Sequence, residues 1–496
     1  MLRGRRAGRR DPTHRPHGPR AATTRRKGQP TAAAAGGSVS TTDRTALTGA
    51  VNQLAEFAAA LTFESLPESV RERVLLLLTD LWGVTVAGAR TPELTRLFAE
   101  WDAEPGRAPI LGTSDTTTAE EAAFLNAVSA CVLELDEGNK HSQGHPAAHI
   151  VFAAMAAVQR SRQAVTGAEF LVAVVAGYEV AARCGRALDR HPLWHPHGHW
   201  GAVGAACAAA LVAGQPAERI AAAMDASGGL MTVTPWSMAL EGNFTRNLWA
   251  ANAGTAGLHA ARLAGSGLVA NTGALASSLG TIIGTLDAAA LVDDLGERWF
   301  ITEGYVKSHS SCAFTHGAID IIQALKARRA FALADVADVL VTTTALARPL
   351  FDGAAHNRLS AMFSFPFVVA AALLNERVDP QAMNPALPAF AQAQALSTRV
   401  RMAASDDFDR LLPDARWVRV DITLTDGTVL TDASPNAIGD ADNSPLGAQQ
   451  ITAKLEVLIG RGDTAHVTDL VGTLATSADA AATLTALSPT IQGAAL

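Results

Sequence analysis

The residues best suited to proton transfer lie in one short segment, Leu133 to His149, which reads LELDEGNKHSQGHPAAH. The segment holds three acids and three histidines between two runs of Ala, Val and Leu, so it is expected to enter a protein interior. Pro146 is typical of the first turn of a helix, which places His145 beside the unpaired N–H groups at the helix start. That local field keeps an imidazole neutral, the form that a base requires. The alternative interpretation is a capped, solvated loop.

A second histidine-rich segment reads DRHPLWHPHGHWGAVGAA and contains His191, His195, His197 and His199. Alternating histidines can indicate a zinc site. No acidic ligand lies among these histidines, and the glycines that follow indicate a helix start with close backbone packing. Proton transfer or carboxylate binding by one imidazole is therefore the favoured interpretation, and a metal site is the alternative.

Two further segments carry groups that could hold an anion. In GYVKSHSSCAFTHGAID, Lys307 is predicted to end a strand and His316 to open a helix, with Cys312 between them. A Cys/His nucleophile is one interpretation. A lysine and an imidazole that hold a carboxylate fit equally well, and a surface lysine with a buried structural thiol is the third interpretation. In NFTRNLWAANAG, Arg246 falls in the first turn of a long helix, where a guanidinium can bind a carboxylate bidentately.

The elements that must position these groups change in type along the chain. Helical spacing of apolar residues dominates residues 44–268, and β-branched alternation with an Asp-Gly turn appears within 269–443. Helical patterns return over 444–496 and are expected to pack on the first helices. The sequence thus predicts a mainly α fold, with a large all-helical domain and a smaller α+β lid that has an antiparallel sheet. Residues 1–43 are predicted to be a disordered basic tail.

Composition limits the classes of function. Ten of the 40 Lys/Arg and one of the 47 Asp/Glu lie in the first thirty residues, so the remaining chain is strongly acidic. An acidic body argues against nucleic acid as the main partner, although a nucleic-acid-binding arm remains an alternative for the tail. No apolar run reaches the ~20 residues that span a bilayer. The cysteines, which form no Cys-x-x-Cys pair, indicate reduced thiols in a cytoplasmic protein and make an iron–sulfur cluster improbable.

Taken in order, these segments resemble the MmgE/PrpD family, whose members include dehydratases, decarboxylases and epimerases of small carboxylic acids. The resemblance runs from about Leu47 to Leu458. Eight pieces in register carry it: LLLLTDLWGVTVAG, AAFLNAVSACVLELDEG, HPAA, GYEVAARCGRA, HPHGHWGAVGAA, NFTRNLWAANAGTAGLHAARLA, YVKSHSSCAFTHGAID and FSFPFVVAAAL.

The resemblance implies a fold and a reaction. The lid would be like chorismate mutase, the site would lie between helical domain and lid, and the chain would form a homodimer. The implied reaction is removal of a proton beside a carboxylate of a small di- or tricarboxylate, followed by loss of water or CO₂. No metal and no cofactor would take part. The alternatives are an epimerase or isomerase at the same site, a metal-dependent hydrolase, and a non-catalytic binding protein.

The resemblance also implies roles for individual residues. His145 and His195 would transfer protons from opposite sides of the cleft, Asp136 would orient an imidazole, and Lys307 would complete the catalytic group. The substrate-binding residues would be Glu134, Asn139, Lys140, His197, Arg246, Cys312 and His316. Three positions depart from the family pattern: Gly138 stands where a threonine is typical, Arg246 replaces a lysine, and Cys312 replaces a histidine of the decarboxylase-like members.

Overall fold

Small residues line the contacts between the most buried helices. Helices α6 (Gly167–Ala187) and α7 (Trp200–Val212) meet at Gly177 and Gly204. A Cβ atom on Gly204 would lie 2.3 Å from the carbonyl oxygen of Gly177, so any larger residue would push the two backbones apart. At the start of α6, Thr166 and Glu169 each accept a hydrogen bond from the other's backbone N–H, which is the capping box that the sequence predicts.

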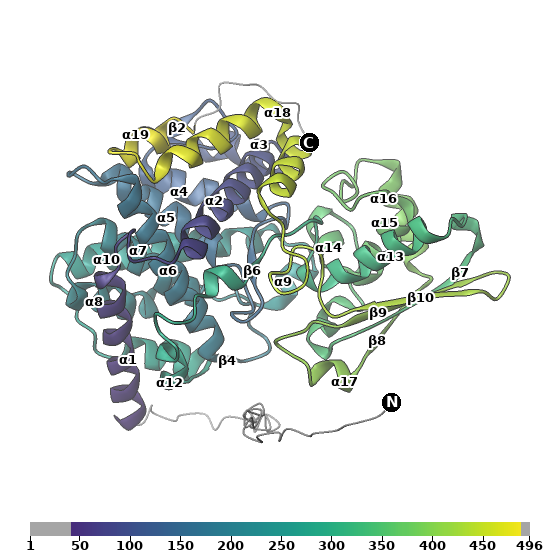
Figure 1. Ribbon diagram of the computed structural model, residues 1–496, viewed down its shortest axis with the longest axis horizontal. Coiled ribbons are helices and arrows are strands. Elements are labelled where there is room, and N and C mark those ends of the chain that lie inside the picture. The colour runs from purple at the N-terminus through teal and green to yellow at the C-terminus, as the bar shows by residue number, and fades with distance from the viewer. Residues whose placement is uncertain (1–40, 488–496) are drawn as a thin grey trace, which may run out of the picture. The chain divides into compact units, whose positions relative to one another are not determined.

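The computed structural model describes residues 41–487, so the predicted tail over 1–43 lies almost wholly outside the described residues. The fold is mainly α, as predicted (Figure 1). Besides α6 and α7, the helices before the lid are α1 (Thr41–Ala60), α2 (Glu68–Ala89), α3 (Pro92–Trp101), α4 (Ala119–Cys131), α5 (Pro146–Arg160), α8 (Ala217–Ser227), α9 (Trp236–Leu240), α10 (Leu248–Gly265), α11 (Ala274–Ser277) and α12 (Ala288–Val292).

The C-terminal helices belong to the same core as the first helices. Helix α18 (Ala448–Leu474) packs against α2, and α19 (Ala480–Thr485) follows it. At the contact, a Cβ atom on Gly83 would lie 2.4 Å from Cδ2 of Leu455. The α18 side chain of Lys454 bonds Oδ1 of the buried Asp80 at 2.7 Å and the carbonyl of Leu135 at 3.3 Å. The end of the chain thereby supports the loop that carries the acids.

A second, smaller core forms around a four-stranded sheet with the order β10-β9-β7-β8. The strands are β7 (Val336–Thr343), β8 (Val400–Ala404), β9 (Val418–Leu424) and β10 (Val429–Ser434). Helices α13 (His316–Arg328), α14 (Arg358–Met362), α15 (Phe365–Leu374), α16 (Pro388–Ser397) and α17 (Asp406–Asp409) accompany them. β9 and β10 are joined by the predicted Asp-Gly turn, in which Gly427 has φ +84°.

The sheet is mixed rather than purely antiparallel, which corrects the prediction. β7 pairs antiparallel with β9 but parallel with β8. The reason lies in the connection: between β7 and β8 the chain forms α14, α15 and α16, long enough for the crossover that parallel pairing requires.

The strand expected in RWFITEGYVKSH is also much shorter than predicted. Phe300–Glu303 forms a 3₁₀ turn, and only β6 (Gly304–Tyr305) pairs, with β3 (Gly138–Asn139). The carboxylate of Glu179 accepts the backbone N–H groups of Phe300 and Ile301 at 3.1 and 2.9 Å, so a side chain replaces the ladder there. Residues 275–306 pack in the first core, although the sequence places them within the lid at 269–443.

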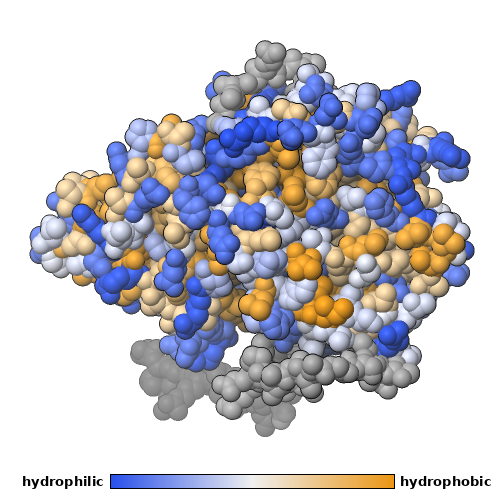
Figure 2. All heavy atoms as spheres, turned by 180° about the vertical axis from the view of Figure 1, so that it is seen from behind, coloured by the Kyte–Doolittle hydropathy of each residue, from blue (hydrophilic) through white to orange (hydrophobic). Residues whose placement is uncertain are grey.

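Two other short pairs complete the described strands: β1 (Pro105–Pro109) with β2 (Thr116–Thr117), and β4 (Leu188–Arg190) with β5 (Gly284–Leu286). No single helix within residues 41–487 has both the length and the apolarity to cross a bilayer. Helices α2 and α3 have that length and apolarity only when taken together, and the chain bends by 77° between them. Figure 2 shows apolar side chains grouped on one face. Among the residues that the structure describes, the most exposed large apolar side chains are Leu193, Val233, Leu268 and Ile282.

Candidate active site

The loop between α4 and α5 buries all three of its acids. Glu134, Asp136 and Glu137 are at most 1 % exposed. The loop re-enters a helix at Pro146, the first residue of α5, and His145 is the N-cap residue of that helix, as the sequence predicts. Buried carboxylates require partners, because an unpaired buried charge is strongly unfavourable. Their partners therefore define the site.

Asp136 pairs with His145. Oδ2 of Asp136 lies 2.9 Å from Nδ1 of His145. Burial alone would raise the pKa of Asp136, but His145 and Lys307 outweigh burial and hold that pKa well below its usual range. Asp136 is therefore ionised and fixes the ring of His145, which leaves Nε2 available. His145 is 8 % exposed, whereas the three acids are almost completely buried.

Two buried cations face the acids from other parts of the chain. Arg246, just before α10, forms an ion pair with Oε1 of Glu134, and Lys307 donates to Oε2 of Glu134 at 3.0 Å. Lys307 Nζ also lies 3.7 Å from Oδ1 of Asp136. Burial alone would lower the pKa of both cations, but Glu134 in particular outweighs burial and raises both pKa values. Both cations therefore stay charged.

Further contacts hold Arg246 in place. Its Nη1 atom donates to Oδ1 of Asn247 at 3.2 Å and reaches the carbonyl of Cys131 at 3.5 Å. Its guanidinium lies over the ring of Phe363 at 5.2 Å. These contacts fix the orientation of the planar group, and Phe363 connects it to the second core.

The second histidine segment lies against the first. The ring of His197 meets those of His145 and His195 edge-on, with centroids 4.6 and 4.7 Å apart. His195 also packs on Trp236 and Trp249, at 4.5 and 5.0 Å. The three imidazoles form a row that begins at the Asp136 pair.

Two of these imidazoles are neutral at ordinary pH. Burial, followed by the charge of Arg246, holds the pKa of His195 and of His197 well below the usual value. The backbone N–H of His197 donates to Nδ1 of His195 at 3.1 Å, which places the proton of His195 on Nε2. Both ring nitrogens of the buried His197 have no hydrogen-bond partner among residues 41–487. His195 can donate a proton to a bound group. His197 can form a hydrogen bond to such a group.

His199 does not join this row. Its Nε2 atom meets the carbonyl of His195 at 2.7 Å, and burial lowers its pKa to about 3. The histidine nitrogens thus point to separate partners. Within residues 41–487 no three His, Cys, Asp or Glu side chains are grouped as a metal site.

Cys312 and His316 occupy different surroundings. The charge of Glu134 acts on the buried Cys312 thiol, whose pKa is raised by burial and then by that carboxylate. A raised pKa disfavours the thiolate that nucleophilic catalysis requires. Nε2 of His316 instead donates to the carbonyl of Ser311 at 3.1 Å, and His316 lines a small cavity with Tyr305 and Arg416.

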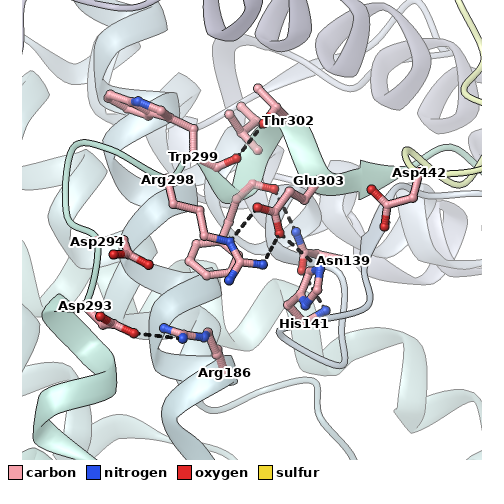
Figure 3. Close-up of polar contacts among 12 residues, drawn as sticks. Asn139, His141, Arg186, Asp293, Asp294, Arg298, Trp299, Thr302, Glu303 and Asp442 are labelled. Carbon is pink, nitrogen blue, oxygen red and sulfur yellow. Dashed lines mark hydrogen bonds and ion pairs between the residues drawn. The ribbon is translucent and has the colours of Figure 1, made fainter. Parts of the chain in front are cut away.

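Three side chains of the loop anchor it to other segments: Asn139 and His141, which Figure 3 shows beside Glu303, and Lys140. Asn139 donates to the carbonyl of Phe300 at 2.8 Å, and Nε2 of His141 pairs with Glu303 at 3.0 Å. The buried Lys140 bonds Oδ1 of Asp440 at 3.2 Å, the carbonyl of Asp414 at 2.9 Å, and Asp442. These side chains are already engaged in anchoring the loop, Lys140 to the segment that leaves the lid.

Glu137 and Tyr178 were missed by the sequence analysis as supports of His145. Oε2 of Glu137 accepts the backbone N–H of Ala147 at 3.2 Å, in the first turn of α5, and Oε1 accepts the hydroxyl of Tyr178. Burial raises the pKa of Glu137 to about 8. A signal was present, because Tyr178 is one of two tyrosines in the chain and lies in an apolar helix. A buried tyrosine hydroxyl usually requires a partner.

The fold and the site together define a mainly helical protein with a buried acid–base pair beside two cations. The family model described as MmgE/PrpD N-terminal domain matches residues 52–290, and the one described as MmgE/PrpD C-terminal domain matches residues 309–468. The chain therefore belongs to the MmgE/PrpD family.

Similar curated proteins include cis-aconitate decarboxylase of Aspergillus terreus, 23 % identical over 450 residues, which are 84 % of this chain and 91 % of that protein. The cis-aconitate decarboxylase-like protein oryM of Aspergillus oryzae is 24 % identical over 338 residues, 62 % of this chain and 69 % of that protein.

Proposed function

We propose that the protein is a lyase that removes a proton beside a carboxylate of a small di- or tricarboxylate and then expels water or CO₂. One observation carries the proposal: the His145–Asp136 pair lies beside the cations of Arg246 and Lys307, all of them buried. A base next to fixed positive charge is what abstraction of a weakly acidic C–H proton demands.

His145 is the base in this mechanism. Nε2 takes the proton, and the ionised Asp136 stabilises the imidazolium through Nδ1. Negative charge then grows on the carboxylate next to the reacting carbon. Lys307 and Arg246 balance that charge at fixed positions in a site of low dielectric, where such interactions are strong.

His195 is the proton donor on the other side of the site. As a neutral imidazole with its proton on Nε2, it donates that proton to the departing hydroxyl, which leaves as water, or to the carbon from which CO₂ has left. An epimerase would use the same two imidazoles on opposite faces of the substrate without a leaving group. This alternative draws on the row of His145, His197 and His195.

The matched relatives support the choice of substrate class, since two are named for decarboxylation of cis-aconitate, a tricarboxylate. The test is incubation of the purified protein with cis-aconitate, citrate and 2-methylcitrate, followed by proton NMR. Loss of CO₂ or water from any of them supports a lyase. Inversion with no loss of mass supports the epimerase, and unchanged spectra with every substrate would overturn both.

We also propose that two copies associate through the helical body. The exposed Leu193, Val233 and Ile282 side chains give that body an apolar surface. Light scattering at micromolar concentration tests this, and a monomer mass would contradict it.

A further inference from the structure

The carboxylate of Glu134 lies between the two buried cations of the site. Oε1 pairs with Nη2 of Arg246, and Oε2 accepts from Nζ of Lys307 at 3.0 Å. All three side chains are at most 1 % exposed. Each oxygen serves one cation, so both cations are already occupied by an anion that belongs to the protein.

The charges of this group are balanced. Glu134 and Asp136 offset Arg246 and Lys307. A substrate carboxylate that entered would add an uncompensated buried charge, which is strongly unfavourable. Binding of an anionic substrate is therefore easiest if one of the two acids releases its cation and moves out of the buried group as the substrate enters, so that the group stays neutral.

Glu134 is the acid that can leave without disturbing the base. Asp136 is held by His145 at 2.9 Å and lies 3.7 Å from Lys307. The Glu134 carboxylate, by contrast, forms its ion pairs and hydrogen bonds within the described residues with the two cations alone. Its departure exposes a pair of cations spaced for one carboxylate and leaves the His145–Asp136 pair intact.

The backbone of Glu134 is strained in a way that fits such a role. Its φ of +50° lies in the left-handed region, which is unfavourable for a residue other than glycine. Strain of this kind persists where surrounding contacts impose it, and it gathers at functional sites. Here the contacts of the side chain are the two ion pairs, so their exchange removes part of what holds the strained conformation.

We propose that Glu134 is a specificity-determining residue: its side chain occupies the carboxylate seat formed by Arg246 and Lys307, and one carboxylate of the substrate replaces it. This inference rests on the proposed function and deepens it. A monocarboxylate gains little, because it exchanges one carboxylate for another at the same seat. A di- or tricarboxylate gains through its further groups, so the internal carboxylate selects for polycarboxylates.

Calorimetric titration tests the exchange with two probes: tricarballylate, which has no hydroxyl to eliminate, and propionate. Glu134→Gln keeps the size of the side chain and removes its charge. It should bind both probes at least about tenfold more tightly than the native protein, with a smaller preference for tricarballylate. Glu179→Gln, another buried glutamate outside the site, is the matched control and should leave both affinities unchanged.

Unchanged or weaker binding by Glu134→Gln would overturn the inference, because Glu134 would then be holding the cations in place for the substrate. Glu134→Asp guards against a folding defect: it retains the charge and should show no gain in affinity, whereas a gain there would also contradict the exchange. Thermal melting of each variant confirms folding. Turnover by the native protein is a separate readout. A gain in affinity without any turnover would contradict the proposed function but would still support the replacement of Glu134 by a substrate carboxylate.

Discussion

Asp136 and His145 stand nine residues apart on one loop, and their side chains meet at 2.9 Å through Oδ2 and Nδ1. The carboxylate of Asp136 is fully buried, while the imidazole of His145 is partly exposed to solvent. This order of burial directs Nε2 of His145 to whatever enters the site. A carboxylate behind a histidine sets the tautomer and stabilises the imidazolium that forms after proton transfer.

Replacing Asp136 by asparagine should lower kcat by about 10²-fold or more, because the charge behind the general base is lost while the shape is kept. KM should change little, since Asp136 does not bind the substrate carboxylate. Steady-state kinetics measures both quantities. His141→Gln is the control on the same loop, as His141 pairs with Glu303 outside the site. A kcat for Asp136→Asn equal to that of His141→Gln would contradict the role of Asp136.

Arg246→Ala should raise KM more than it lowers kcat, because it removes a charge that holds the substrate before and during the reaction. Arg246→Lys should restore part of the affinity, since it returns the charge but loses the contacts to Asn247 and the carbonyl of Cys131. The same kinetic measurements decide the matter. If Arg246→Ala changed kcat alone, the arginine would be acting only in the transition state.

Glu137→Gln should change how stability depends on pH. The pKa of Glu137 is raised by burial from 4.5 to about 8 in the folded protein. Below about pH 4.5 both states hold the proton; as the pH rises toward 8 only the folded state does, so the native protein loses stability over that range. Glutamine carries no such proton. The Tm of Glu137→Gln minus that of the native protein should therefore grow from about pH 5 to pH 8, and a constant difference would argue that Glu137 is already ionised.

Activity should survive removal of metal ions. Nε2 of His199 meets the carbonyl of His195, and Nδ1 of His195 accepts from the backbone of His197, so these nitrogens do not converge. Dialysis against EDTA followed by an activity assay and elemental analysis measures the outcome. Activity lost on chelation and restored by zinc would return the histidine-rich segment to its alternative interpretation as a metal site.

The sequence predicted the helix starts of this site well, because their signals are local. Pro146 and the Thr166–Glu169 pair act within one turn of their own helices. The parallel pairing of β7 with β8 was not predicted, since alternation along a strand does not reveal its neighbour's direction. The prediction of a strand near Phe300 was wrong for a similar reason. The carboxylate that accepts the backbone N–H of Phe300 belongs to Glu179, more than a hundred residues earlier in the chain.

The candidate site shows the same division. The residue pattern together with the family resemblance singled out Asp136, His145 and Lys307, which the fold brings together. The sequence could not distinguish Lys307 from Lys140, which carries the same charge but forms ion pairs with Asp440 and Asp442. Which cation faces the site and which anchors a loop depends on contacts across three hundred residues.

Deuterium exchange at the carbon beside the substrate carboxylate is the most direct test of the central claim that His145 transfers that proton. Native protein and His145→Ala are incubated with cis-aconitate, citrate and 2-methylcitrate in D₂O, and the products are followed by NMR. The native protein should incorporate deuterium or release CO₂ or water with at least one of them. His145→Ala should be slower by about 10²–10⁴-fold. A native rate retained by folded His145→Ala would contradict the assignment of the base.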